Sequence, residues 1–119
     1  MSPDEGSDIA TFSDLVAACL RVMRYVEGAS RSDLDRNNLL LSGCCYQIAV
    51  IGEAVKRLSP ITRSKHPEVP WKDIAGMRDR LIHSYDSVDA DELWKTATED
   101  VPALLDQVRA IQAADFRQL

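Results

Sequence analysis

Apolar residues recur at the spacing of an α-helix through most of this chain, and no stretch shows the sustained apolar–polar alternation of a β-strand. The clearest example lies near the N-terminus, where the apolar offsets are 3, 4, 7, 8, 11 and 14: Phe12, Leu15, Val16, Cys19, Leu20, Met23 and Val26. Such offsets place side chains on one face of a helix. The pattern therefore predicts an all-α protein built from amphipathic helices.

Capping and breaking residues divide the chain into four predicted helices. They run from Ser7 or Asp8 to about Glu27 (before Gly28), from Ser32 to Leu58, from Trp71 into the segment 83–87, and from Asp89 or Asp91 to about Gln112. Pro102 should kink or restart the last helix, because proline lacks the backbone donor that a helix interior uses. The segment 59–70 holds three prolines and is expected to be a loop with at most one short turn.

Four helices joined by short connections favour an antiparallel bundle, with a fifth helix if the short turn or the kinked last helix is counted separately. At 119 residues the chain fits a single domain. We expect it to span residues 8–112, with flexible tails at 1–7 and 113–119. No apolar run approaches the length of a membrane span, and the N-terminus does not look like a secretion signal. These features predict a soluble, cytoplasmic protein that does not contact a membrane.

The second predicted helix has apolar residues on more than one side. Tyr46 and Val50 lie off its main stripe, so this helix is expected to be contacted on two sides. Gly52 costs about 1 kcal/mol relative to alanine inside a helix. Either a neighbouring helix or chain approaches closely there, or the glycine is simply tolerated.

The chain lacks the usual ligand patterns for metals and cofactors. Cys19, Cys44 and Cys45 do not have zinc or redox spacing, and they are expected to be reduced, buried thiols. His66 and His83 stand far apart in the chain, and we interpret His66 as structural or exposed. No metal or cofactor is therefore expected.

One short segment gathers side chains suited to chemistry on a phosphodiester. Arg78, Asp79, Arg80, His83 and Tyr85 crowd into the end of the third helix. Basic residues at a helix C-terminus are also common for electrostatic reasons alone. A histidine, a fixed cation and a phenol nevertheless form a minimal set for acid–base cleavage at a phosphate.

The segment Arg78-x-x-x-x-His83-x-Tyr85, with the polar Asp79 after the arginine, resembles the signature of the HEPN superfamily, most closely the HepT-like toxins. Further similar words follow in the same order: Ile51-Gly52-Glu53-Ala54, Lys65-His66-Pro67-Glu68-Val69-Pro70-Trp71, Ile74-Ala75-Gly76-Met77-Arg78, and Val88-Asp89 through Trp94. The likeness covers roughly Gln47 to Leu105, about half of the chain. In one place the sequence departs from the family, since Tyr46 stands where members often carry a basic residue.

The resemblance implies a HEPN-like bundle that forms a homodimer and cleaves RNA without a metal. It further implies the toxin component of a type II or type VII-like toxin–antitoxin pair. Arg78 would hold the scissile phosphate, and His83 would transfer the proton of the ribose 2′-OH or of the leaving 5′-oxygen. Asp79 and Arg80 would support them. The antitoxin, a minimal nucleotidyltransferase, would silence the toxin by transferring AMP to Tyr85.

Several alternatives stay open at the level of the sequence. Glu53 would orient His83, pair with Arg78 or face solvent. Arg78 and His83 lie about 140° apart on an ideal helix, so the arginine reaches around, the helix distorts near His83, or two protomers complete one cleft. The competing functions are a catalytically inactive helical subunit that binds the nucleotidyltransferase or a nucleotide, and a plain helical oligomer.

The overall charge argues against a protein that binds polyanions non-specifically, because the net charge is −5. The distribution is uneven, however. The window from Lys56 to Arg80 carries +4 and the remainder −9. Positive charge thus gathers around the candidate motif, as expected for a local phosphate site.

Overall fold

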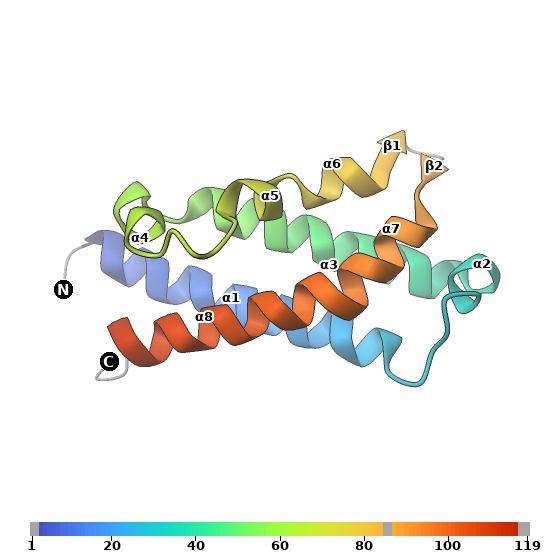
Figure 1. Ribbon diagram of the computed structural model, residues 1–119, viewed down its shortest axis with the longest axis horizontal. Helices are drawn as coiled ribbons and strands as arrows, with labels where there is room; N and C mark the ends of the chain where they lie inside the picture. The colour runs from blue at the N-terminus through green and yellow to red at the C-terminus, as the bar shows by residue number, and fades with distance from the viewer. Residues whose placement is uncertain (1–2, 85–86, 117–119) are drawn as a thin grey trace.

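Four long rods run side by side in the computed structural model, which describes residues 3–84 and 87–116 (Figure 1). The rods are α1 (Pro3–Val26); α3 (Asn38–Arg57); α5 (Trp71–Ala75) followed by α6 (Met77–Leu81); and α7 (Ala90–Lys95), the π-helix η1 (Thr96–Asp100) and α8 (Val101–Asp115) as one continuous rod. Two short helices, α2 (Asp33–Arg36) and α4 (Pro60–Lys65), connect them. The predicted all-α bundle is confirmed, with one addition: the two-stranded hairpin of β1 (Ile82–Ser84) and β2 (Ser87–Val88).

The core lies where α1 meets α3 on one side and α8 on the other. Fully buried side chains from these three helices fill it, among them Phe12, Leu15, Val22, Ile48, Ile51, Val55, Leu104 and Val108. The third rod adds Ile74, Met77 and Leu81 from above α3. The predicted stripe of α1 therefore faces this core, except for Leu20, which is 36% exposed.

The first predicted helix starts earlier than its sequence suggested. Helix α1 begins at Pro3, where a proline needs no hydrogen-bond partner, and Asp4 and Glu5 follow in the first turn, where acidic groups are favoured. Asp8 is not a cap; its buried carboxylate accepts hydrogen bonds from Ser59 and Thr62 instead. At the other end, Gly28 has the positive φ of +74° expected of a residue that terminates a helix. Residues 3–7 and 113–115 are helical, so the helices extend past the expected domain limits of 8 and 112.

The second predicted helix is two helices. Asn37 leaves the helical conformation, with φ −121° and ψ 94°, and its side chain accepts a hydrogen bond of 3.0 Å from the backbone N–H of Leu40. An asparagine in this position caps the N-terminus of the following helix. Helix α3 therefore begins at Asn38 rather than continuing from Ser32.

The third rod is divided and the fourth is irregular in its middle. Gly76 separates α5 from α6, and η1 precedes Pro102, whose missing N–H interrupts the ladder as predicted. Asp89 caps α7 by accepting a hydrogen bond of 3.0 Å from the N–H of Glu92. The predicted loop 59–70 contains the six-residue α4, which Ser59 caps.

Gly52 of α3 lies where a neighbouring backbone approaches closely. A Cβ atom at this position would lie 3.2 Å from the carbonyl oxygen of Ala75 in α5. Of the two interpretations left open above, close approach by a neighbouring helix is the one observed. The missing side chain allows the rod that carries the candidate motif to pack directly on α3.

The three cysteines are buried, free thiols, as predicted. Burial raises the pKa of Cys19 to about 12; burial and, secondarily, the neighbouring Cys45 raise the pKa of Cys44 to about 11. Because the thiolate is the reactive form, these side chains act as small apolar residues of the core.

Helix α3 is, by length and composition, apolar enough to cross a membrane, with a mean hydropathy of 1.3 in its most apolar 18-residue window. It nevertheless packs against α1, α5 and α6 as the central helix of the bundle. This is the arrangement of a core helix in a soluble domain. Only 44% of that window is buried within the protomer, however, so an apolar part of α3 faces outward.

Candidate active site

The candidate motif lies at the junction of α6 and the hairpin, at the end of the bundle away from the start of α1 and the end of α8 (Figure 1). Helix α6 stops at Leu81, and Ile82 is already extended, with φ −112° and ψ 103°. The backbone N–H of Asp89 donates a 2.8 Å hydrogen bond to the carbonyl oxygen of Leu81, which closes the base of the hairpin. The helix therefore ends two residues before His83, and of the three geometries left open it is the distortion near His83 that is observed.

His83 lies on β1 with an exposed side chain. Its ring makes no hydrogen bond or ion pair with any of residues 3–84 or 87–116. The imidazole is thus open to a ligand on the surface of the hairpin. Tyr85, the expected acceptor of AMP, lies outside the described residues.

Arg78 is also exposed, on the first turn of α6. Its Nη1 lies 3.3 Å from Oδ1 of Asp79, and the side chain is 53% exposed. Such a surface ion pair contributes little to stability. The guanidinium is therefore available to a phosphate, with Asp79 as its partner in the free protein.

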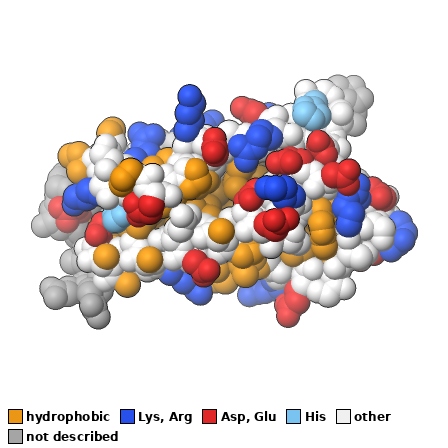
Figure 2. Space-filling view, in the orientation of Figure 1, with side chains coloured by type: hydrophobic (Ala, Val, Ile, Leu, Met, Phe, Trp, Pro, Cys, Tyr) orange, Lys and Arg blue, Asp and Glu red, His pale blue; other side chains and the backbone are white. Residues whose placement is uncertain are grey.

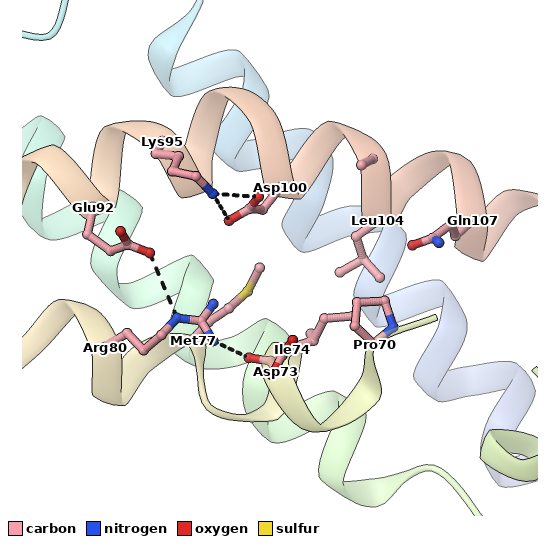
Figure 3. Close-up of a pocket in the computed structure, with 11 residues that line it drawn as sticks. Pro70, Asp73, Ile74, Met77, Arg80, Glu92, Lys95, Asp100, Leu104 and Gln107 are labelled. Carbon is pink, nitrogen blue, oxygen red and sulfur yellow. Dashed lines mark hydrogen bonds and ion pairs between the residues drawn. The ribbon is translucent and has the colours of Figure 1, made fainter. Parts of the chain in front are cut away.

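Arg80 points away from Arg78, because two residues along a helix correspond to a rotation of about 200°. Its Nη1 donates a 2.9 Å hydrogen bond to the carbonyl oxygen of Asp73, and its Nε lies 3.8 Å from Oε1 of Glu92 (Figure 3). Arg80 therefore ties α6 to the middle of α5 and to α7. It holds the helix that carries Arg78 and does not stand beside His83.

Glu53 contacts neither member of the motif. Its carboxylate lies 3.2 Å from Nζ of Lys56, and the side chain is 70% exposed. Of the three alternatives left open for Glu53, the solvent-facing position is the one observed within the protomer.

His66 has a structural role in the loop between α4 and α5. Its Nε2 lies 2.8 Å from Oδ2 of Asp115, and its backbone carbonyl accepts a 2.9 Å hydrogen bond from Nε1 of Trp71. These contacts join the start of α5 to the end of α8. Among the described residues, no group of three or more His, Cys, Asp or Glu side chains is placed to hold a metal ion.

A cleft of about 430 Å³ opens between α5–α6 and the rod of α7, η1 and α8 (Figure 3). Ile74, Met77 and Leu104 form its apolar floor. Arg80 with Glu92 and Lys95 with Asp100 lie at its rim, and Figure 2 shows this face with acidic and basic side chains interleaved around the apolar hollow. The cleft was not predicted from the sequence, because its lining residues lie up to 37 positions apart in the chain. The only local signal was the cap at Asp89, which marks the start of α7 and so of the second wall.

Comparisons with known proteins agree with this architecture. The model of the family described as "Ribonuclease HepT-like" matches residues 15–111. A protein named "Putative RNase" from Caldanaerobacter subterraneus subsp. tengcongensis is 39% identical over 82% of this chain and 87% of its own length. "Probable ribonuclease HepT" from Thermococcus cleftensis is 49% identical over 48% of this chain and 52% of its own length.

A further "Putative RNase", from Methanocaldococcus jannaschii, is 33% identical over 82% of this chain and 84% of its own length. No solved structure matches. The family match covers most of the bundle, from the middle of α1 to the last turns of α8, and the first and third of these relatives each cover 82% of the chain. The chain belongs to the HepT-like ribonuclease family, and ribonuclease is the enzyme class that this membership supports.

Proposed function

We propose that this protein is a metal-independent endoribonuclease that cuts RNA with Arg78 and His83. The observation that carries the proposal is the exposure of both side chains on either side of the α6–β1 junction, within the region that matches the ribonuclease family. Within the described part of the chain, His83 has no hydrogen-bond or ion-pair partner and Arg78 pairs with a surface carboxylate, so both side chains can meet a substrate.

The chemistry assigned to these residues is transesterification at phosphorus. The ribose 2′-oxygen attacks the phosphorus and loses its proton, the bond from phosphorus to the 5′-oxygen breaks, and the leaving oxygen takes up a proton. His83 transfers one of these protons as the acid or base. The guanidinium of Arg78 holds the phosphate oxygens and stabilises the negative charge that develops on them. The products are a 2′,3′-cyclic phosphate and a 5′-hydroxyl, and the requirement for a 2′-OH restricts the substrate to RNA.

The test is digestion of single-stranded RNA by the purified protein in the presence of EDTA. We expect cleavage, with cyclic phosphate ends identified by mass spectrometry. If the purified protein binds RNA but leaves it intact in both EDTA and Mg²⁺, the alternative function, an inactive helical subunit that binds a nucleotidyltransferase or nucleotide, takes its place.

The outward face of α3 supports the homodimer. Leu39 is 83% exposed and Tyr46 66% exposed, and Gly43 and Val50 lie on the same side of the helix. We call these four residues the α3 stripe. A helix that is apolar on most sides is normally buried on most sides, and a second copy packed antiparallel on the stripe would bury it. Because α5 and α6 flank α3, such a partner would bring two Arg78–His83 segments to one face of the dimer.

Replacing Tyr46 with glutamate should break this dimer. A two-fold interface would bury two unpaired carboxylates, so we expect the dissociation constant of the dimer to rise at least about 100-fold. Light scattering at micromolar concentration measures the effect. Ile61→Glu is the matched control, because Ile61 of α4 is 65% exposed but lies outside the stripe. A monomeric wild-type protein, or equal effects of the two substitutions, would contradict the interface.

The same proposal makes this protein the cytoplasmic toxin of a type II or type VII-like toxin–antitoxin pair. Its antitoxin would be a minimal nucleotidyltransferase that transfers AMP to the phenol of Tyr85. The modification adds bulk and a negative phosphate two residues from His83. It would therefore repel the phosphate of an approaching RNA.

Intact mass after co-expression with the nucleotidyltransferase tests this switch. We expect increments of one or more AMP units on the wild-type protein and none on Tyr85→Phe. The modified protein should cut RNA at least tenfold more slowly than the unmodified protein. Increments that persist on Tyr85→Phe would assign the modification to another residue.

A further inference from the structure

The rod formed by α5 and α6 has two exposed edges that differ in charge. Asp73 and Arg80 face the cleft, whose lining carries three carboxylates, those of Asp73, Glu92 and Asp100, against the two cations Arg80 and Lys95. The other edge runs beside α3, where the carbonyl oxygen of Ala75 packs against Gly52. We call this opposite edge the α3 edge.

Lys72 and Arg78 flank the α3 edge. Lys72 precedes Ala75 by three residues and Arg78 follows it by three, so on an ideal helix their side chains are rotated by about 60° to either side of Ala75 and lie about 120° apart. Helical hydrogen bonds reach Gly76 from both sides of the break: its N–H donates to the carbonyl oxygen of Lys72 at 3.1 Å, and its carbonyl oxygen accepts from the N–H of Arg80 at 3.3 Å. Both side chains are exposed, and Lys72 pairs with no carboxylate among residues 3–84 and 87–116.

Lys56 of α3 lies on the same side of the molecule. It follows Gly52 by about one helical turn, and Gly52 is the point where α3 touches α5. Helices α3 and α5 run in opposite directions (Figure 1), so the turn after Gly52 lies beside the turn before Ala75, where Lys72 stands. The ammonium group of Lys56 is 3.2 Å from Glu53 in an exposed pair, which a phosphate can replace at little cost.

We propose that Lys56 and Lys72 form, together with Arg78, a track that binds the backbone phosphates of single-stranded RNA beside the bond that is cut. This inference rests on the proposed function, since it takes Arg78 and His83 as the cleavage site. Lys72 and Arg78 are six residues apart, about 9 Å along the rod. His83 follows beyond Arg78 in the same direction, so the track leads an RNA strand from the α3–α5 contact to the catalytic histidine.

The track also accounts for how a chain with a net charge of −5 would bind RNA at all. Non-specific binding by overall charge is unfavourable for such a protein. Each cation on the track that contacts a phosphate releases counterions condensed on the RNA. A few local cations can therefore favour binding even though the surface as a whole is not basic. The face with the cleft, where carboxylates outnumber cations, would not compete for the strand.

The salt dependence of RNA binding tests the track. The probe is a fluorescein-labelled single-stranded RNA with 2′-O-methyl riboses, which lacks the attacking hydroxyl, and the readout is fluorescence anisotropy between about 50 and about 200 mM salt. We expect Lys56→Gln and Lys72→Gln each to weaken binding about fivefold at 0.1 M salt and to reduce the slope of log K against log salt by about 0.7. Lys95→Gln changes the net charge equally but lies at the cleft, and it should leave both quantities unchanged.

Cleavage of a dinucleotide such as UpA separates this inference from the proposed function. A dinucleotide is too short to reach both lysines, so the two lysine variants should cut it as fast as the wild-type protein while cutting long RNA more slowly at low concentration. If all three glutamine variants bind RNA alike, the track is wrong even when His83 is catalytic. The opposite result is also informative. If the wild-type protein cuts no RNA, but the slope of log K against log salt falls for Lys56→Gln and Lys72→Gln and not for Lys95→Gln, the track stands and the nuclease proposal fails.

Discussion

Replacing His83 with alanine is expected to lower the rate of RNA cleavage in EDTA by two to four orders of magnitude, the usual contribution of a positioned acid or base. The side chain is exposed on the hairpin and makes no hydrogen bond or ion pair with the described residues, so its removal should leave the fold and its thermal stability unchanged. A loss of rate without a loss of structure would therefore report chemistry. The measurement is the initial rate of cleavage of a labelled single-stranded RNA.

The chain offers a matched control, because its other histidine lies elsewhere. His66 is largely buried between Glu68 and Asp115. His66→Ala should lower stability modestly by removing these contacts and should leave the cleavage rate of the folded protein within about twofold. Equal rates for wild-type and His83→Ala protein would mean that the cleavage comes from another residue or from a contaminating nuclease.

Arg78→Lys refines the same experiment. Lysine keeps the positive charge but lacks the two parallel donors with which a guanidinium holds a phosphate. We expect an intermediate loss of rate in this variant. Full activity would assign Arg78 a purely electrostatic role, with no need for a forked contact.

The helical rods and the position of the motif were predictable because both depend on neighbours in the sequence. The stripe from Phe12 to Val26 needs only the helical period. The end of the third helix was expected within the segment 83–87 but falls earlier, at Leu81, because Ile82 already has an extended conformation. Caps are also local, and Asp89, one of the two starts predicted for the last helix, is the observed cap. Asn37 was missed because Ser32 offered a competing cap five residues earlier.

The contacts that arrange the site were not predictable, since they join residues far apart in the chain. Arg80 and Glu92 are on different rods, and neither spacing nor composition pairs them. The carboxylate of Glu53 pairs with Lys56 at the surface, whereas the sequence could not decide between His83, Arg78 and solvent as its surroundings. The two faces of the α5–α6 rod became apparent only when Ala75 was seen to pack on Gly52.

Asp8 is the clearest case of a residue whose role comes from distant partners, and its replacement should have the largest effect on stability. The carboxylate is 2% exposed and accepts three hydrogen bonds: from the N–H of Ser59 at 3.0 Å, from Oγ of Ser59 at 2.7 Å and from Oγ1 of Thr62 at 2.5 Å. These bonds fasten α1 to the cap of α4, 51 residues away. Hydrogen bonds to a charged group are the strong ones, and donors left unpaired in a buried site cost further free energy.

Asp8→Ala should therefore lower the free energy of unfolding by about 3 kcal/mol, which corresponds to a fall in Tm of roughly 10 °C for a domain of this size. Urea denaturation followed by circular dichroism measures the change.

Asp14→Ala is the control, because Asp14 is exposed on the same helix, with only a 4.0 Å contact to Arg57, and should shift the free energy of unfolding by less than about 0.5 kcal/mol. Because the start of α1, which holds Asp8, and the hairpin lie at opposite ends of the bundle (Figure 1), the Asp8 variant should cut RNA at the wild-type rate wherever it remains folded. Equal stabilities for the two variants would mean that the α1–α4 contact contributes nothing, and a loss of cleavage in folded Asp8→Ala protein would mean that the two ends of the bundle are coupled.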